Sequence, residues 1–162
     1  MKLLETLVLS QSDDAFAALT ANLPIDTATV MGVETHRLAM DSDLAALMYH
    51  ASLDAPPSEA MLEHLFHHLS AVLVLVNATL GDLPETHRTL IDTTAARNDG
   101  GSLVVAVQSD PARIDALPEV IRTRGMALGE RGRMVFWNPH HLPSRRTVLT
   151  LLWHDLLEPA TV

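Results

Sequence analysis

Short apolar runs alternate along the chain with segments whose apolar residues recur at helical spacing. Predominantly apolar runs predict buried strands at 3–9, 71–76, 103–107 and 134–137. Capping residues followed by apolar positions three or four apart predict helices at 13–22, 58–69, 84–97, 115–128 and 144–157. Strands and helices therefore follow one another along most of the chain.

Residues 29–50 depart from this alternation. The β-branched composition at the start of 29–40 favours a strand, and the turn-forming triplet Asp-Ser-Asp follows at 41–43. A second apolar segment covers 44–50. We therefore expect a hairpin between the first and second helices.

The order of the expected elements indicates the fold class. It runs strand, helix, two strands, and then helix and strand in alternation up to a final helix. Such an order is typical of α/β proteins in which helices cover both faces of a mostly parallel sheet. We expect a single domain over residues 1–162, with three layers and a six-stranded sheet whose one antiparallel strand lies at an edge.

Composition and charge narrow the range of functions. The 162 residues are 48% hydrophobic, which fits one globular domain. Twenty acidic residues against eleven basic ones give a formal net charge of -9, which disfavours binding to nucleic acid or to an anionic membrane. The absence of cysteine excludes disulfides, thiolate metal sites and a cysteine nucleophile. No apolar run suggests a signal peptide or a membrane span, so we expect a cytoplasmic protein.

Three stretches of the chain resemble Ras-like small GTPases, and in particular the bacterial gliding-motility branch and the GTPases that work with roadblock-type partners. Residues 30–50 (VMGVETHRLAMDSDLAALMYH) look like the second and third strands of that family around a tight turn. Residues 69–110 look like its fourth strand, third helix and fifth strand, and residues 133–157 like its last strand and closing helix. The resemblance implies a P-loop GTPase-like fold over nearly the whole chain.

The phosphate-binding motif of that family is missing. The motif GxxxxGK[ST] uses glycines to turn backbone amides toward the phosphates and a lysine to reach the terminal ones. The corresponding residues 10–15 (SQSDDA) contain neither glycine nor lysine, and Lys2 is the only lysine of the chain. Asp13 and Asp14 stand where the phosphates would lie, and the stretch is too short for the loop.

The family's two other signatures are also degenerate. The segment that binds magnesium and phosphate corresponds to 49–58 (YHASLDAPPS), which has no glycine and offers only Asp54 as a metal ligand. The guanine-reading Asn-Lys-x-Asp corresponds to 108–111 (QSDP), where Asp110 lies one place early. We therefore predict a pseudo-GTPase that is not an enzyme and has no cofactor, with weak residual nucleotide hydrolysis left open.

A group of histidines invites comparison with zinc enzymes. His64 and His68 have the i, i+4 spacing of zincin ligands, with His67 beside them. The zincin motif requires glutamate directly after the first histidine, and Leu65 occupies that position. A solvated helix face explains these histidines, so we predict no metal site, although metal binding by His64, His67 and His68 stays open.

A polar rim is expected beyond the carboxyl ends of the parallel strands, where open α/β sheets bind ligands. The rim consists of Ser10, His50, Asn77, Gln108, Asp110, Asn138, His140 and His141. Residues that would contact a bound ligand there are Ser10, Asn77, Asp110, Asn138 and His140. Ser10, His50 and Asp110 also form a conceivable nucleophile set, but the chain lacks the nucleophile elbow GxSxG.

Three functions follow from these observations. The first is a protein-interaction or regulatory module, for which the resemblance implies a roadblock-type dimer as partner. An exposed edge strand near 29–37 also favours self-association through strand pairing. The second is a small-ligand or nucleotide-binding protein, or an enzyme, with a lysine-free site at the rim, where Arg113 or Arg145 would contact phosphate. The third is a degenerate receiver-like signalling domain, which would have five all-parallel strands.

Overall fold

The computed structural model describes residues 1–81, 83–98, 101–109 and 132–157. They form one seven-stranded sheet with the strand order β2-β3-β4-β1-β5-β6-β7. The strands are β1 (Lys2–Ser10), β2 (Ile25–Val30), β3 (Val33–Asp41), β4 (Leu44–Ser52), β5 (Ala71–Asn77), β6 (Ser102–Gln108) and β7 (Gly132–Trp137). The helices are α1 (Asp13–Thr20), α2 (Glu59–Phe66), α3 (Glu85–Arg97) and α5 (Leu142–Leu157), with a short 3₁₀ turn η1 (Ala78–Leu80). The helix expected at 115–128 lies outside the described residues.

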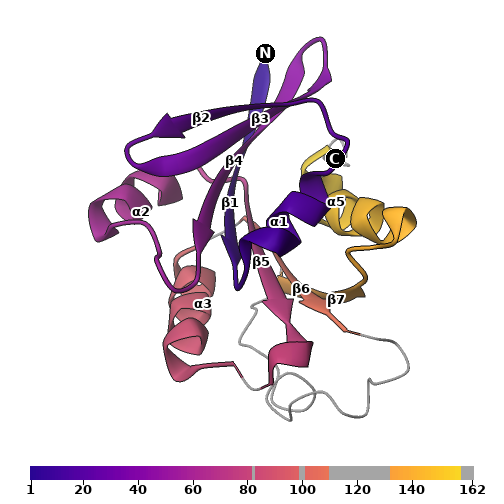
Figure 1. Ribbon diagram of the computed structural model, residues 1–162. Helices are drawn as coiled ribbons and strands as arrows, with labels where there is room; N and C mark the ends of the chain where they lie inside the picture. The colour runs from indigo at the N-terminus through magenta and orange to yellow at the C-terminus, as the bar shows by residue number, and fades with distance from the viewer. Residues whose placement is uncertain (82, 99–100, 110–131, 158–162) are drawn as a thin grey trace.

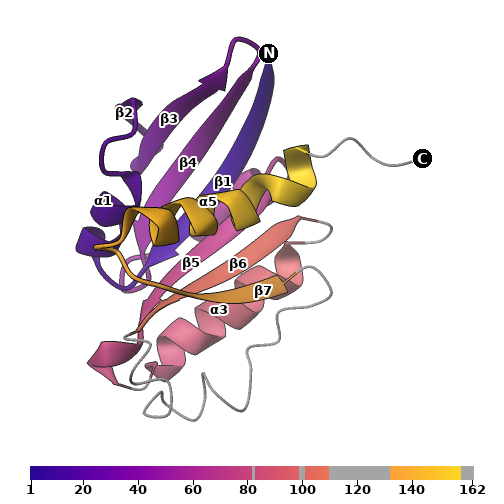
Figure 2. The same cartoon turned by 90° about the vertical axis from the view of Figure 1, so that its right-hand side faces the viewer.

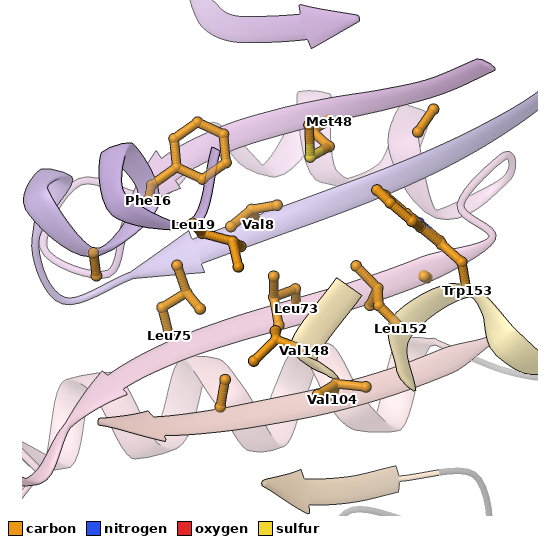
Figure 3. Packing of buried hydrophobic residues seen from close by; sticks show 14 of the residues in the cluster. Val8, Phe16, Leu19, Met48, Leu73, Leu75, Val104, Val148, Leu152 and Trp153 are labelled. Atoms are coloured by element: carbon orange, nitrogen blue, oxygen red, sulfur yellow. The ribbon is translucent and has the colours of Figure 1, made fainter. Parts of the chain in front are cut away.

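The fold has three layers, with the sheet in the middle and helices on both of its faces (Figures 1 and 2). Helices α2 and α3 pack on one face, where Leu65 and Ile91 join a buried cluster with Val72 and Val74 of β5. Helices α1 and α5 cover the other face (Figure 3). The expected α/β class with helices on both faces is confirmed.

The central strands are buried on both faces, as their continuous apolar sequences predicted. All side chains of β5 from Ala71 to Val76 are almost inaccessible, and those of β6 from Leu103 to Val107 are equally buried. Strands β1, β5, β6 and β7 run parallel, and β4 runs parallel to β1. Burial of this kind requires helices above and below, which α1, α5, α2 and α3 provide.

The prediction of a six-stranded sheet with one antiparallel edge strand was wrong. Strand β3 is antiparallel to both of its neighbours and lies inside the sheet, whereas the edge is formed by β2. The segment expected as one strand over 29–40 is divided by a turn at Met31 and Gly32. Pairing of Ile25 with Leu38 through to Val30 with Val33 builds the additional strand. Antiparallel pairing at this edge is incompatible with a receiver-like sheet of five parallel strands.

The turn between β2 and β3 holds a residue in an unusual conformation. Met31 has φ 51° and Gly32 has φ 77°, so both central residues of the two-residue turn are left-handed. This conformation suits glycine and asparagine, whereas it costs an ordinary L residue about 1–2 kcal/mol. The Met31 side chain is also 66% exposed, so packing does not offset this cost.

We expect Met31→Asn to raise the free energy of unfolding by up to about 1 kcal/mol, because asparagine tolerates this conformation. Thermal unfolding should show a rise of about 2–4 °C for a domain of this size. Leu80→Asn is the matched control, since Leu80 is 65% exposed but lacks a positive φ. An equal change in both variants would show that lost surface hydrophobicity, and not the turn conformation, is responsible.

None of the helices in the described part of the chain is both long enough and apolar enough to cross a bilayer.

Candidate functional site

The junction between β1 and α1 is short and is held by hydrogen bonds on both sides. Only Gln11 and Ser12 separate the end of β1 from the start of α1. The Gln11 amide donates to the Leu75 carbonyl at 3.0 Å, and its side-chain Oε1 accepts from the Asn77 amide at 2.6 Å. The Ser12 hydroxyl accepts from the Ala15 amide at 3.4 Å and caps the helix. The junction is therefore fixed to β5 on one side and to its own helix on the other.

The end of α1 that faces the strand ends is acidic. Asp13 and Asp14 occupy its first turn, and the Ser12 side chain already takes one of the free amides. A phosphate-binding loop instead leaves these amides free for the ligand. The eight-residue loop of the GTPase motif does not fit into a two-residue connection.

Two of the other predicted rim residues, Asn77 and Asn138, stabilise the turns that follow their strands. Asn77 Oδ1 accepts from the amide and the hydroxyl of Thr79, at 3.0 and 2.5 Å. Asn138 Oδ1 accepts from the His140 amide at 2.9 Å, and the Asn138 amide donates to the Ser144 hydroxyl at 2.8 Å. The side chains of Asn77 and Asn138 thus accept hydrogen bonds within the turns that follow β5 and β7. Asp110 and Arg113 lie outside the described residues.

Two members of the rim do meet. Ser10 Oγ lies 2.8 Å from His50 Nε2, joining the ends of β1 and β4. The Ser10 side chain is completely buried, so a substrate has no access to its hydroxyl. Phe16 of α1 stacks on the His50 ring, with centroids 4.0 Å apart and planes 14° apart. The Ser10–His50 bond therefore lies beneath α1 as part of a packed layer.

Beside this pair is a cluster that the sequence did not predict, formed by Glu34, His36 and His50 and called here the histidine–glutamate cluster. His36 Nε2 lies 2.6 Å from Glu34 Oε1, and His50 Nδ1 lies 3.9 Å from the same oxygen. The second nitrogen of His36, Nδ1, lies 3.1 Å from the hydroxyl of Thr27 on β2. Both histidines are 8% exposed, whereas the Glu34 side chain is 55% exposed. The cluster therefore opens to solvent on its glutamate side.

The backbone explains how the three side chains come together. Glu34 faces His50 directly across the β3–β4 ladder, and His36 follows Glu34 by two positions on the same face. A β-bulge between Ala39 and Asp41 shifts the pairing by one residue. A one-residue shift exchanges the faces of a strand, so the bulge places His50 on the side of Glu34 and His36.

Burial dominates the titration of His50. Loss of hydration lowers the pKa of its imidazole, and the opposing influence of the Glu34 and Asp13 carboxylates does not reverse this. The neutral ring is therefore the favoured form in the folded protein.

Two cavities flank the histidine–glutamate cluster. One has a volume of about 390 Å³ and lies between α1 and the β2–β3 hairpin, lined by Phe16, Thr20 and Thr27 among others. The other, of about 350 Å³, lies toward Met31 and the loop after β4. Asp13, Glu34 and His50 line both cavities. A small polar ligand therefore has access to the cluster from two sides.

The remaining predicted candidates have separate surroundings. Asp54 Oδ1 lies 2.6 Å from Nε2 of the buried His87 on α3, so this carboxylate points toward α3. His64 on α2 and His67 and His68 directly after this helix are all exposed, as the solvated-face interpretation predicted. The rings of His64 and His68 lie 5.5 Å apart.

Comparisons with known proteins identify the fold. No protein-family model and no curated protein matches the chain. Among solved structures, the chain is similar to a point variant of the Aquifex aeolicus protein Era bound to GDP and AlF4⁻, with a TM-score of 0.55 and 12% sequence identity. The alignment covers 94% of this chain but 57% of the Era chain, so the chain spans little more than half of that protein's length. At this identity the likeness shows the fold alone, which is GTPase-like.

Proposed function

We propose that this GTPase-like domain has lost nucleotide binding and acts as a protein-interaction or regulatory module. The observation that carries the proposal is the connection between β1 and α1. Gln11 and Ser12 alone make this connection, and Asp13 follows directly. A phosphate would have to displace the Ser12 cap and lie against carboxylates.

Electrostatics gives the size of this effect. A carboxylate ~4 Å from a phosphate raises the free energy of binding by ~4 kcal/mol at an effective dielectric constant of about 20, because both groups are negative. That energy corresponds to roughly a thousandfold in affinity. With Lys2 as the only lysine, the usual compensating cation is also absent.

The partner-binding surface that we favour is the outer edge of β2 with the adjoining turn. β2 pairs only with β3 in the described part of the sheet, and its last five residues are exposed. Val30 and Met31 add exposed apolar side chains, 44% and 66% accessible. An exposed strand edge with neighbouring apolar side chains suits a partner that adds a strand to the sheet.

The resemblance of the sequence to GTPases that work with roadblock-type proteins directs the choice of partner. We propose a roadblock-type dimer at the β2 edge, with pairing of two copies of this chain as the alternative occupant. The edge expected near 29–37 is in fact formed by Ile25–Val30, because residues from Val33 onward belong to the interior strand β3.

Val30→Lys is expected to weaken binding of a roadblock-type partner about tenfold or more, because a lysine at a strand edge opposes strand addition. Affinities should be measured by calorimetry against a panel of purified roadblock-type proteins, and self-association by sedimentation. Leu80→Lys is the control, since it places the same charge at an exposed leucine outside β2. No binding to any member of the panel would contradict the roadblock partner, and equal weakening by both variants would contradict the β2 surface.

A further inference from the structure

We propose that the histidine–glutamate cluster binds a divalent transition-metal ion such as Zn²⁺ through Glu34 Oε1, His36 Nε2 and His50 Nδ1. These residues each offer one ligand atom, and the three atoms lie within 4.8 Å of one another. Two imidazoles and one carboxylate form a donor set that suits zinc and other first-row divalent ions. The sequence predicted no metal here, because the cluster depends on the β3–β4 register.

The geometry requires only small side-chain movements. Donor atoms ~2.1 Å from a tetrahedral zinc ion lie ~3.4 Å apart. The Glu34–His36 contact of 2.6 Å would open, and the Glu34–His50 separation of 3.9 Å would close. The half-exposed Glu34 side chain is free to adjust both of these contacts. The His36 and His50 ligand atoms, which lie within 4.8 Å of one another, would come to ~3.4 Å by rotation of the two rings.

A second observation supports the assignment. The nitrogen of each histidine that faces away from Glu34 lies beside a hydroxyl: His36 Nδ1 beside Thr27 Oγ1 at 3.1 Å, and His50 Nε2 beside Ser10 Oγ at 2.8 Å. A histidine that binds a metal through one nitrogen keeps its proton on the other and donates it to such an acceptor. Each hydroxyl is therefore placed to accept the proton of the nitrogen that would not bind the ion, which leaves His36 Nε2 and His50 Nδ1 as the ligand atoms.

The surroundings complete a site with an open coordination position. Three protein ligands leave a zinc ion one position for water or a small ligand. The cavities of about 390 and 350 Å³ reach the cluster from two sides, and the Asp13 carboxylate that lines both adds negative charge. Because the ligands come from β3 and β4 and the supporting Thr27 from β2, a bound ion would brace the hairpin against the sheet.

The test is a titration of the metal-free 162-residue chain with Zn²⁺, followed by calorimetry, and with Co²⁺, followed by its visible absorption. We expect one ion per chain, and Glu34→Gln and His36→Gln should each weaken binding about tenfold or more. Mg²⁺ should not compete, because it prefers oxygen ligands. Glu34→Gln changes an exposed side chain, so it keeps the test valid if the substitution at the buried His36 prevents folding.

The exposed His64 and His68 provide the matched control. Their i, i+4 spacing makes them the competing zinc site. His64 lies on α2 and His68 follows the end of this helix, which packs on the opposite face of the sheet. The double variant His64→Gln/His68→Gln should bind Zn²⁺ as tightly as the unaltered chain. The proposal is overturned if this double variant loses binding, if Glu34→Gln leaves the affinity unchanged, or if the unaltered chain binds no ion.

Discussion

Replacing Trp153 with alanine is expected to lower the free energy of unfolding by about 3–5 kcal/mol. The indole is 3% exposed and belongs to the cluster that joins α5 to β1, β4, β5 and β6 (Figure 3). Its Nε1 donates to the buried Thr6 hydroxyl at 3.2 Å, so the substitution also leaves this hydroxyl without its partner. For a domain of this size the midpoint of thermal unfolding should fall by about 6–20 °C.

Leu157→Ala is the control for this prediction. It shortens a side chain near the end of the same helix, but Leu157 is 44% exposed. We expect a change within about 0.5 kcal/mol, as for most surface substitutions. Equal and small losses in the two variants would contradict the packing of α5 on the sheet.

Phe16→Ala is expected to cost a similar amount, about 3–5 kcal/mol. Phe16 is 4% exposed, stacks on His50 at 4.0 Å and meets the His36 ring at 4.8 Å in a tilted arrangement. The substitution removes both the apolar burial and these ring contacts, and it opens the layer that covers Ser10. Chemical denaturation of the purified variant measures the loss.

Phe16→Leu separates the two contributions. Leucine keeps most of the apolar burial but loses the ring contacts, so we expect a cost of about 1–2 kcal/mol. If Phe16→Ala lowers the free energy of unfolding by less than about 1 kcal/mol, Phe16 does not hold α1 against the two histidines.

Much of the fold could be predicted from the sequence, because buried positions require apolar residues and so leave a recognisable pattern. Strands β5 and β6 are apolar at nearly every position since both of their faces are covered, and α2 shows its buried Met61, Leu62 and Leu65 at helical spacing. Strand β2 could not be recognised as a separate strand, because an edge strand with one partly buried residue shows no apolar alternation. Its presence also depends on a turn in which methionine adopts a conformation that sequence rules assign to glycine or asparagine.

The candidate site was only partly predictable for a different reason. Topology alone places Ser10 and His50 at the ends of neighbouring strands, and these two side chains do meet. The approach of Glu34 and His36 to His50 depends on the bulge between Ala39 and Asp41. No residue type in the hairpin predicts the position of this bulge. Asn77 and Asn138 were expected to face a ligand, but each is used by the turn that follows its own strand.

The most direct test of the proposed loss of nucleotide binding is thermal unfolding of the purified chain with GDP, GTP and ATP, each with and without Mg²⁺. A ligand at about 100 times its dissociation constant adds ~2.7 kcal/mol, which raises the midpoint of a domain of this size by about 5–11 °C. The two-residue connection at Gln11 and Ser12 and the carboxylates of Asp13 and Asp14 predict no shift with any nucleotide. A magnesium-dependent, guanine-specific rise would contradict the account and would point to a lysine-free nucleotide site at the strand ends.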